Sequence, residues 1–206
     1  MSKVRLSSIL LLIMFVLGSG SLDHAVAANG AKGPLPQAEM DRKRQDYYTD
    51  LRLVTHDGRT VRFYSDLLKD KTVLIHFYYV NCKTTAARQS KVLSDLQPLL
   101  GERLGRDIFL VSITVDPAND TPEKVRDYAR VFAPRPGWTF VTGKKENVDW
   151  INYRLGNFTP DPEKHSALYL LGNLRTGHWQ KDQPETRARS LADHLLALAD
   201  EMGGKP

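Results

Sequence analysis

The stretch Thr72–Val80, with the sequence TVLIHFYYV, decides the fold together with the Asn81 and Cys82 that follow it. It is filled with β-branched and aromatic residues and is apolar at both odd and even positions, which is typical of a strand buried on both faces. Ile108–Val115 has the same character. Two strands of this kind predict a largely parallel sheet with helices on both faces.

Helical patterns follow both strands. Leu93, Leu96 and Leu100 recur at helical spacing and predict a helix over 85–104, with Pro98 as a kink or break. Thr121-Pro122-Glu123 combines a capping hydroxyl, a proline at the first helical position and an early acid, so a second helix is expected to run to about residue 132. The other expected elements are a hairpin of strands 51–55 and 60–63, strands 138–142 and 166–171, a strand around Trp179, a helix over 146–155 and a terminal amphipathic helix with Leu191, Leu195, Leu198 and Met202.

The order of these elements predicts an α/β protein. It is the order of a thioredoxin-like fold with an added N-terminal β-hairpin and an inserted helix and strand. The domain is expected over residues 47–202. Residues 29–46 contain Gly, Pro and scattered charge without a hydrophobic period, which predicts a flexible linker.

The N-terminus resembles a secretory signal. Lys3 and Arg5 precede the apolar run Ile9–Leu17, and the small residues Ala25 and Ala27 fit a signal-peptidase site. We therefore expect residues 1–28 to be a signal peptide, with an uncleaved membrane anchor as the alternative. Either reading predicts export, to the periplasm or to the outer face of the inner membrane, where the redox environment is oxidising.

Composition excludes several classes of protein. The 206 residues are 41% hydrophobic and 26% charged, as in an ordinary globular domain. A single cysteine rules out a framework of disulfides within the chain. The net charge of +5 arises from 29 basic and 24 acidic residues that are interspersed, which argues against a nucleic-acid-binding protein.

Cys82 is the first candidate for chemistry. It follows a buried strand and precedes a helix, so its sulfur is expected near free backbone N–H groups and the positive end of the helix dipole. Lys83 and Arg88 add positive charge, and together these features predict a reactive or metal-binding thiolate. The alternative is a buried, inert cysteine, against which the loop position and the polar neighbours Asn81 and Thr84 argue.

Four ordered motifs carry a resemblance to a known family. They are YYVNCKTTA at 78–86, VDPANDTP at 115–122, PGWTFVTG at 136–143 and KHS at 164–166. The chain resembles the Sco/SenC family of copper-binding, thioredoxin-like proteins that help to assemble the copper centre of cytochrome c oxidase. The resemblance covers roughly residues 47–198.

The resemblance implies a copper site, and this chain departs from it. The family binds copper through a C-x-x-x-C motif and a distant histidine; Cys82 matches the first cysteine and His165 the histidine. Ala86 stands at the second cysteine, so a methyl group replaces one thiolate, and Ala87 stands where the family usually has proline. Cys82 and His165 remain as candidate Cu(I) ligands, because a thiolate and an imidazole suit two-coordinate Cu(I). Dithiol–disulfide cycling within one molecule is excluded.

Other polar residues are further candidates for the site. Asp116 and Asp120, together with Lys83, are candidate site-loop residues, but the two aspartates more readily explain a turn before Pro117 and a helix cap. His76, within the buried strand, is interpreted as a hydrogen-bonded core residue. The remaining histidines of the expected domain are His56, His178 and His194. They lie in the hairpin or at expected surface positions, and none has a short spacing to Cys82.

The leading hypothesis is an accessory protein for copper delivery to, or assembly of, a respiratory oxidase. Its partners would be an oxidase subunit or another copper-handling assembly factor. Two alternatives remain open: a one-cysteine thiol-redox protein that uses Cys82, and a degenerate scaffold or binding module that no longer binds copper. An unpaired exported thiol also allows a dimer linked through Cys82.

Overall fold

The computed structural model describes residues 35–82 and 84–201. These residues form a seven-stranded sheet with the order β2-β1-β5-β4-β3-β6-β7. The central strands β3, β4 and β5 are parallel to one another, whereas the hairpin β1–β2 and the pair β6–β7 join them antiparallel. The strands are β1 (Arg52–Thr55), β2 (Thr60–Arg62), β3 (Thr72–Tyr78), β4 (Ile108–Thr114), β5 (Trp138–Thr142), β6 (Tyr169–Asn173) and β7 (His178–Asp182). This arrangement confirms the predicted α/β class with an added N-terminal hairpin.

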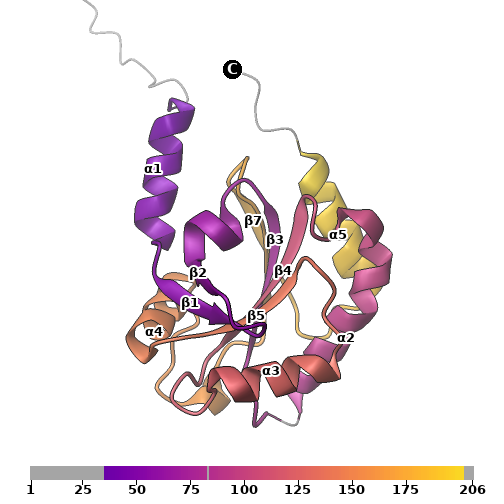
Figure 1. The fold of residues 1–206 in the computed structure, drawn as a ribbon. Helices are drawn as coiled ribbons and strands as arrows, with labels where there is room; N and C mark the ends of the chain where they lie inside the picture. The colour runs from indigo at the N-terminus through magenta and orange to yellow at the C-terminus, as the bar shows by residue number, and fades with distance from the viewer. Residues whose placement is uncertain (1–34, 83, 202–206) are drawn as a thin grey trace, which may run out of the picture. The chain divides into compact units, whose positions relative to one another are not determined.

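Helices cover both faces of the sheet (Figure 1). On one face, α2, α3 and α5 pack against Leu74 and Tyr78 of β3. On the other face, α4 and the π-helical segment η1 pack against Val73, Ile75 and Phe77. Side chains alternate between the faces of a strand, and both faces of β3 are apolar, so this strand is buried on both sides. The helices are α1 (Gln37–Tyr48), η1 (Phe63–Leu68), α2 (Thr85–Leu100), η2 (Gly101–Arg103), α3 (Pro122–Val131), α4 (Lys145–Arg154), η3 (Pro162–Lys164) and α5 (Ala188–Asp200).

The N-terminal part of the described chain differs from the expectation. The prediction of a flexible linker over 29–46 is wrong for residues 37–46, because the helix α1 occupies them. The sequence does not predict this helix, because none of its residues is buried and its sequence therefore has no hydrophobic period. Its end is anchored by Tyr48, whose ring stacks on Tyr64 at 6.2 Å. The expected signal peptide or anchor lies outside the described residues.

Two other boundaries differ for local reasons. Pro98 lies inside α2 without ending it; the backbone donor that proline lacks is replaced in part by the Gln97 side chain, which donates to the Ser94 carbonyl at 3.5 Å. The strand expected from residue 166 begins only at residue 169, because Ser166 exchanges backbone hydrogen bonds with the Asn157 side chain instead of a neighbouring strand.

Within the residues that the structure describes, no helix is long and apolar enough to cross a membrane.

Candidate functional site

Cys82 lies where the chain leaves β3 and enters α2. A tight turn precedes it, closed by the Cys82 N–H, which donates to the Tyr79 carbonyl at 3.0 Å. The Ala86 N–H in the first turn of α2 donates to Cys82 Sγ at 3.5 Å, and Thr84 Oγ1 lies 3.8 Å from the sulfur. The helix N-terminus thus directs its free donors at the thiol, as predicted.

The thiol is more buried than predicted. Its polar neighbours argued against burial, but Cys82 is only 7% exposed and joins the apolar cluster of α2, α3 and α5. Burial by itself would raise the pKa of the Cys82 thiol. Hydrogen bonds from the Ala86 and Thr84 amides and from the Thr84 and Tyr79 side chains outweigh it and lower the pKa. The outcome is a shielded cysteine that nevertheless ionises readily.

His165 directly follows the short helix η3. Its Nδ1 donates to the Pro162 carbonyl at 2.7 Å, which leaves the lone pair of the neutral ring on Nε2. Nε2 is buried and has no hydrogen-bond partner among the residues that the structure describes. Burial also lowers the pKa of the ring, so the imidazole is neutral at pH 7. A neutral ring held through one nitrogen, with the other free, has the form of a metal-ligating histidine.

Tyr79 lies beside both candidate ligands. Its ring meets the His165 ring edge-on, with the centroids 5.8 Å apart. Its hydroxyl interacts with the Cys82 thiol, and burial together with this interaction raises the pKa of Tyr79 to about 12. Tyr79 was not identified from the sequence as part of the site. The signal was its place in the turn, three residues before Cys82.

Ala86 offers no ligand. Its methyl group is fully buried in the apolar cluster beneath α2. Over residues 35–82 and 84–201, no group of three or more His, Cys, Asp or Glu side chains could hold a metal ion. Among these residues, Cys82 and His165 thus have no third side chain of these kinds grouped with them.

The site-loop candidates separate into different roles. Lys83 lies outside the described residues. Asp120 is buried and structural: its carboxylate accepts the Val80 N–H at 3.2 Å and the Thr114 hydroxyl at 2.5 Å, so it braces the chain just before Cys82. Burial raises the pKa of Asp120 to about 6. The helix cap is Thr121, not Asp120.

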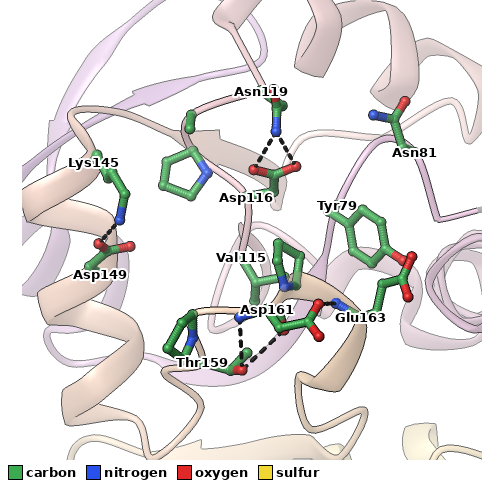
Figure 2. A pocket seen from close by; sticks show the side chains of 14 residues that line it. Tyr79, Asn81, Val115, Asp116, Asn119, Lys145, Asp149, Thr159, Asp161 and Glu163 are labelled. Atoms are coloured by element: carbon green, nitrogen blue, oxygen red, sulfur yellow. Dashed lines mark hydrogen bonds and ion pairs between the residues drawn. The ribbon is translucent and has the colours of Figure 1, made fainter.

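Asp116 belongs to a cleft next to the candidate ligands. The cleft has a volume of about 460 Å³, and Figure 2 shows Tyr79 on one side of it and α4 on the other. Pro162, whose carbonyl holds His165, also lines it. Its acidic lining consists of Asp116, Asp149, Asp161 and Glu163.

Among the described residues, the other histidines have partners of their own, although His76 lies near enough to His165 for that ring to contribute to its lowered pKa. His76 is fully buried, and its Nδ1 lies 3.1 Å from the Ser112 hydroxyl, as a core histidine should. His56 contacts the Phe140 backbone. His178 and His194 pair at the surface with Glu201 and Asp182.

The sheet defines a thioredoxin-like protein. Its distinguishing features are a cysteine at the strand-to-helix turn and a histidine in a neighbouring loop. The SCO1/SenC family model matches residues 39–172, and the chain belongs to this family.

Known relatives agree with this assignment. An SCO2-like protein of Rickettsia conorii is 26% identical over 141 residues, which are 68% of this chain and 66% of the relative. The SCO1 protein homolog of Bacillus subtilis is 31% identical over 127 residues, 56% of this chain and 63% of the relative. The chain thus spans about two thirds of the length of these relatives.

Solved structures share the fold. ScoI of Bradyrhizobium japonicum, solved with copper bound, superposes with a TM-score of 0.61 at 22% identity and covers 72% of this chain and 96% of its own. BsSco, a member of the Sco family of cytochrome c oxidase assembly proteins, gives a TM-score of 0.61 at 20% identity, with 74% and 92% coverage.

Proposed function

We propose that this protein binds Cu(I) as cargo through Cys82 and His165 and takes part in assembling the copper centre of a respiratory oxidase. Family membership supports the process, because a related structure holds copper and another belongs to a family of oxidase assembly proteins. The observation that carries the proposal for this chain is His165 Nε2, a buried lone-pair nitrogen without a partner on a ring that contacts Tyr79.

The two donors match the demands of Cu(I). A thiolate is a soft ligand, and the amides at the start of α2 favour the ionised form of Cys82. The imidazole of His165 is neutral, so no proton has to leave before it binds. With one thiolate fewer than the family motif, binding is weaker and Cu(II) is retained poorly.

Export is part of the proposal. Residues 1–28 act as a signal peptide or as a membrane anchor, which puts the domain in the periplasm or on the outer face of the inner membrane. One solved relative is a SCO1/SenC family lipoprotein of Bacillus anthracis. Copper sites of oxidases on that side of the membrane would be the destination of the metal.

Competition with a Cu(I) chelator tests the copper proposal. The reduced protein is titrated beside Cys82→Ser, His165→Ala and the surface control His178→Gln. We expect one equivalent to bind, with at least a tenfold loss of affinity in the first two variants and none in the control. Equal affinity in all four proteins, or no binding to the native sequence, would contradict the proposal.

A thiol-redox protein is the second candidate, favoured by the lowered pKa of Cys82. The thiolate would be oxidised by a peroxide to a sulfenic acid, with release of water or an alcohol. Two equivalents of an external thiol would then reduce the sulfenic acid through a mixed disulfide, with release of water and of the external disulfide. Turnover of micromolar peroxide that is lost in Cys82→Ser but kept in His165→Ala would select this function.

A scaffold without copper is selected if the double variant Cys82→Ser with His165→Ala keeps its cellular phenotype.

A further inference from the structure

An apolar cleft lies on the outer side of α4. It has a volume of about 290 Å³ and is lined by Trp150, Tyr153 and Phe158, with Glu146 and Asp149 at its rim. The three aromatic residues are 44%, 61% and 47% exposed. Single exposed apolar side chains are common, but three large aromatics around one cleft mark a binding surface. We call these three residues the aromatic platform.

The position of the platform follows from the helix. The inner side of α4 is buried and consists of Val148, Ile151 and Asn152. Residues 146, 149, 150 and 153 recur at helical spacing on the opposite side, so the rings of Trp150 and Tyr153 emerge together.

Neighbouring groups hold the platform rings in place. Trp150 and Tyr153 stack with their centroids 5.6 Å apart. The Arg154 guanidinium lies 5.2 Å from the Trp150 ring and 4.8 Å from the Tyr47 ring. The Tyr47 hydroxyl donates to the Arg154 carbonyl at 2.9 Å. Rings fixed in this way lose little conformational freedom when a partner binds.

The platform adjoins the acidic cleft. Asp149 lines both, and the chain runs from Phe158 directly into the segment 159–163, which lines the acidic cleft. Figure 2 shows Thr159, Asp161 and Glu163 of this segment. That segment contains Pro162, which holds His165. A partner that covers both clefts therefore lies against Tyr79 and Pro162, the residues that contact the candidate copper ligands.

Charge indicates the kind of partner. The chain is basic overall, with a net charge of +5, but four carboxylates line the acidic cleft. Lys145 is the basic residue in its lining, and it pairs with Asp149. Asp161 pairs with the exposed Lys164 at 3.2 Å. Among the described residues, neither Asp116 nor Glu163 has an ion-pair partner. Such a surface attracts cations and repels an anionic membrane.

We propose that the aromatic platform and the acidic cleft together form the docking site for a partner protein, which inserts a large apolar side chain beside Trp150 and places neighbouring lysines or arginines over the acidic cleft. The inference rests on the proposed function in one respect: docking there would place the partner next to Tyr79 and Pro162, which contact the candidate ligands Cys82 and His165, for copper transfer.

Fluorescence polarisation with synthetic peptides tests the docking site. The probes are a labelled basic peptide with an apolar centre, GKKWLKKG, its acidic counterpart GEEWLEEG, and GKKGGKKG, which lacks the apolar residues. They are titrated with the full-length protein, with Trp150→Ala combined with Phe158→Ala, with Tyr153→Ala alone, and with Glu163→Gln. Val131→Ala and Glu102→Gln, which change exposed residues elsewhere, are the matched controls.

We expect GKKWLKKG to bind at least tenfold more tightly than the other two peptides. Affinity should fall about tenfold in the double platform variant and less in Tyr153→Ala, and Glu163→Gln should weaken binding mainly at low salt. The controls should bind as the native protein does. Because Tyr153 is the most exposed platform residue, its variant keeps the test valid if the double variant does not fold.

Several results would overturn the inference. They are no binding of GKKWLKKG, equal binding of the acidic peptide, unchanged affinity in the platform variants, and Trp150-dependent binding to vesicles of phosphatidylglycerol. The Cu(I) affinity of each variant is measured in parallel. If none of the proteins binds copper, the proposed function fails, while the peptide affinities still decide the docking site.

Discussion

At the scale of single residues, the chemistry of this protein depends on Ala86, which stands where the resemblance to the Sco/SenC motif implies a second cysteine. Ala86 still lies in the first turn of α2, and its N–H still donates to Cys82 Sγ at 3.5 Å. The backbone amide that favours the ionised form of the cysteine is therefore in place, and the Ala86 side chain itself supplies no ligand. Since Cys82 is nearly buried, a disulfide between two copies of the chain would require this loop to move.

Tyr79→Phe is expected to raise the pKa of Cys82 and to slow its reaction at neutral pH. The substitution removes the hydroxyl that hydrogen-bonds the thiolate and leaves the ring against His165. The rate of alkylation by iodoacetamide, followed against pH, should show its midpoint at higher pH than in the native protein. An unchanged midpoint would mean that the amides of α2 alone set the pKa of the thiol.

Protonation of His76 is expected to destabilise the fold in acid. Burial, with a smaller contribution from His165, lowers the pKa of His76 from 6.5 to about 3 in the native state. Between these values the unfolded chain binds more protons, so the free energy of unfolding falls as the pH drops from 6.5 towards 3. Asp120 acts in the opposite direction: its pKa is raised from 3.8 to about 6, so the native state binds more protons there and gains stability as the pH falls through this range.

The variant His76→Phe separates the two effects. Urea unfolding at pH 7 and pH 5 should show a smaller loss of stability in acid for His76→Phe than for the native protein. The surface variant His178→Gln should behave like the native protein. If His76→Phe lost as much stability as the native chain, other groups would govern the acid sensitivity.

At the scale of elements, helix caps place the loops around the site. Thr121 accepts the Lys124 N–H at 3.4 Å and begins α3, directly after the Asp120 that braces the Cys82 loop. Thr121→Ala should lower the free energy of unfolding by about 1 kcal/mol, because the N–H loses its side-chain acceptor. Thr121→Ser keeps the acceptor and should cost much less. Equal losses in the two variants, measured by urea unfolding, would assign the effect to packing of the threonine methyl.

Sequence patterns predicted the elements that have a buried side. β3 and β4 were recognisable because both of their faces are apolar, and α3 because its cap, proline and acid stand in order. α1 escaped notice because it buries none of its residues. The segment η1 was not predicted either, because its six residues are too few to show a periodic pattern.

The positions of Cys82 and His165 were predictable from the sequence, but their surroundings were not. Cys82 lies at the strand-to-helix turn that the sequence predicts and His165 in a loop after η3, and both remain candidate ligands. The contact of Tyr79 with both residues depends on the side-chain direction at the end of β3, and the burial of Cys82 depends on the helices packed around it. Neither can be read from local sequence, because each arises from segments far apart in the chain.

At the scale of the whole molecule, Cys82 and Ala86 belong to the apolar cluster that α2, α3 and α5 form with the sheet. Restoring the second thiol should therefore act on copper and on stability in opposite directions. Ala86→Cys should bind Cu(I) at least tenfold more tightly, since it completes a three-ligand set. It should also lower the stability of the reduced protein by about 1–3 kcal/mol, because Ala86 has no exposed surface and the added sulfur must displace core atoms.

Ala86→Ser is the control for this variant. A serine adds an atom of similar position without a soft ligand, so it should lose stability without gaining copper affinity. Chelator competition and urea unfolding measure the two properties separately. A gain in affinity with Ala86→Ser as large as with Ala86→Cys would contradict the role given to the thiol.

The copper K-edge X-ray absorption spectrum of the Cu(I)-loaded protein tests the central claim most directly. We predict a first coordination shell of one sulfur and one imidazole nitrogen, with the nitrogen lost in His165→Ala and the sulfur lost in Cys82→Ser. Two sulfur ligands would indicate copper bridging two molecules through Cys82. A shell without sulfur, or one unchanged in His165→Ala, would contradict a copper site formed by Cys82 and His165.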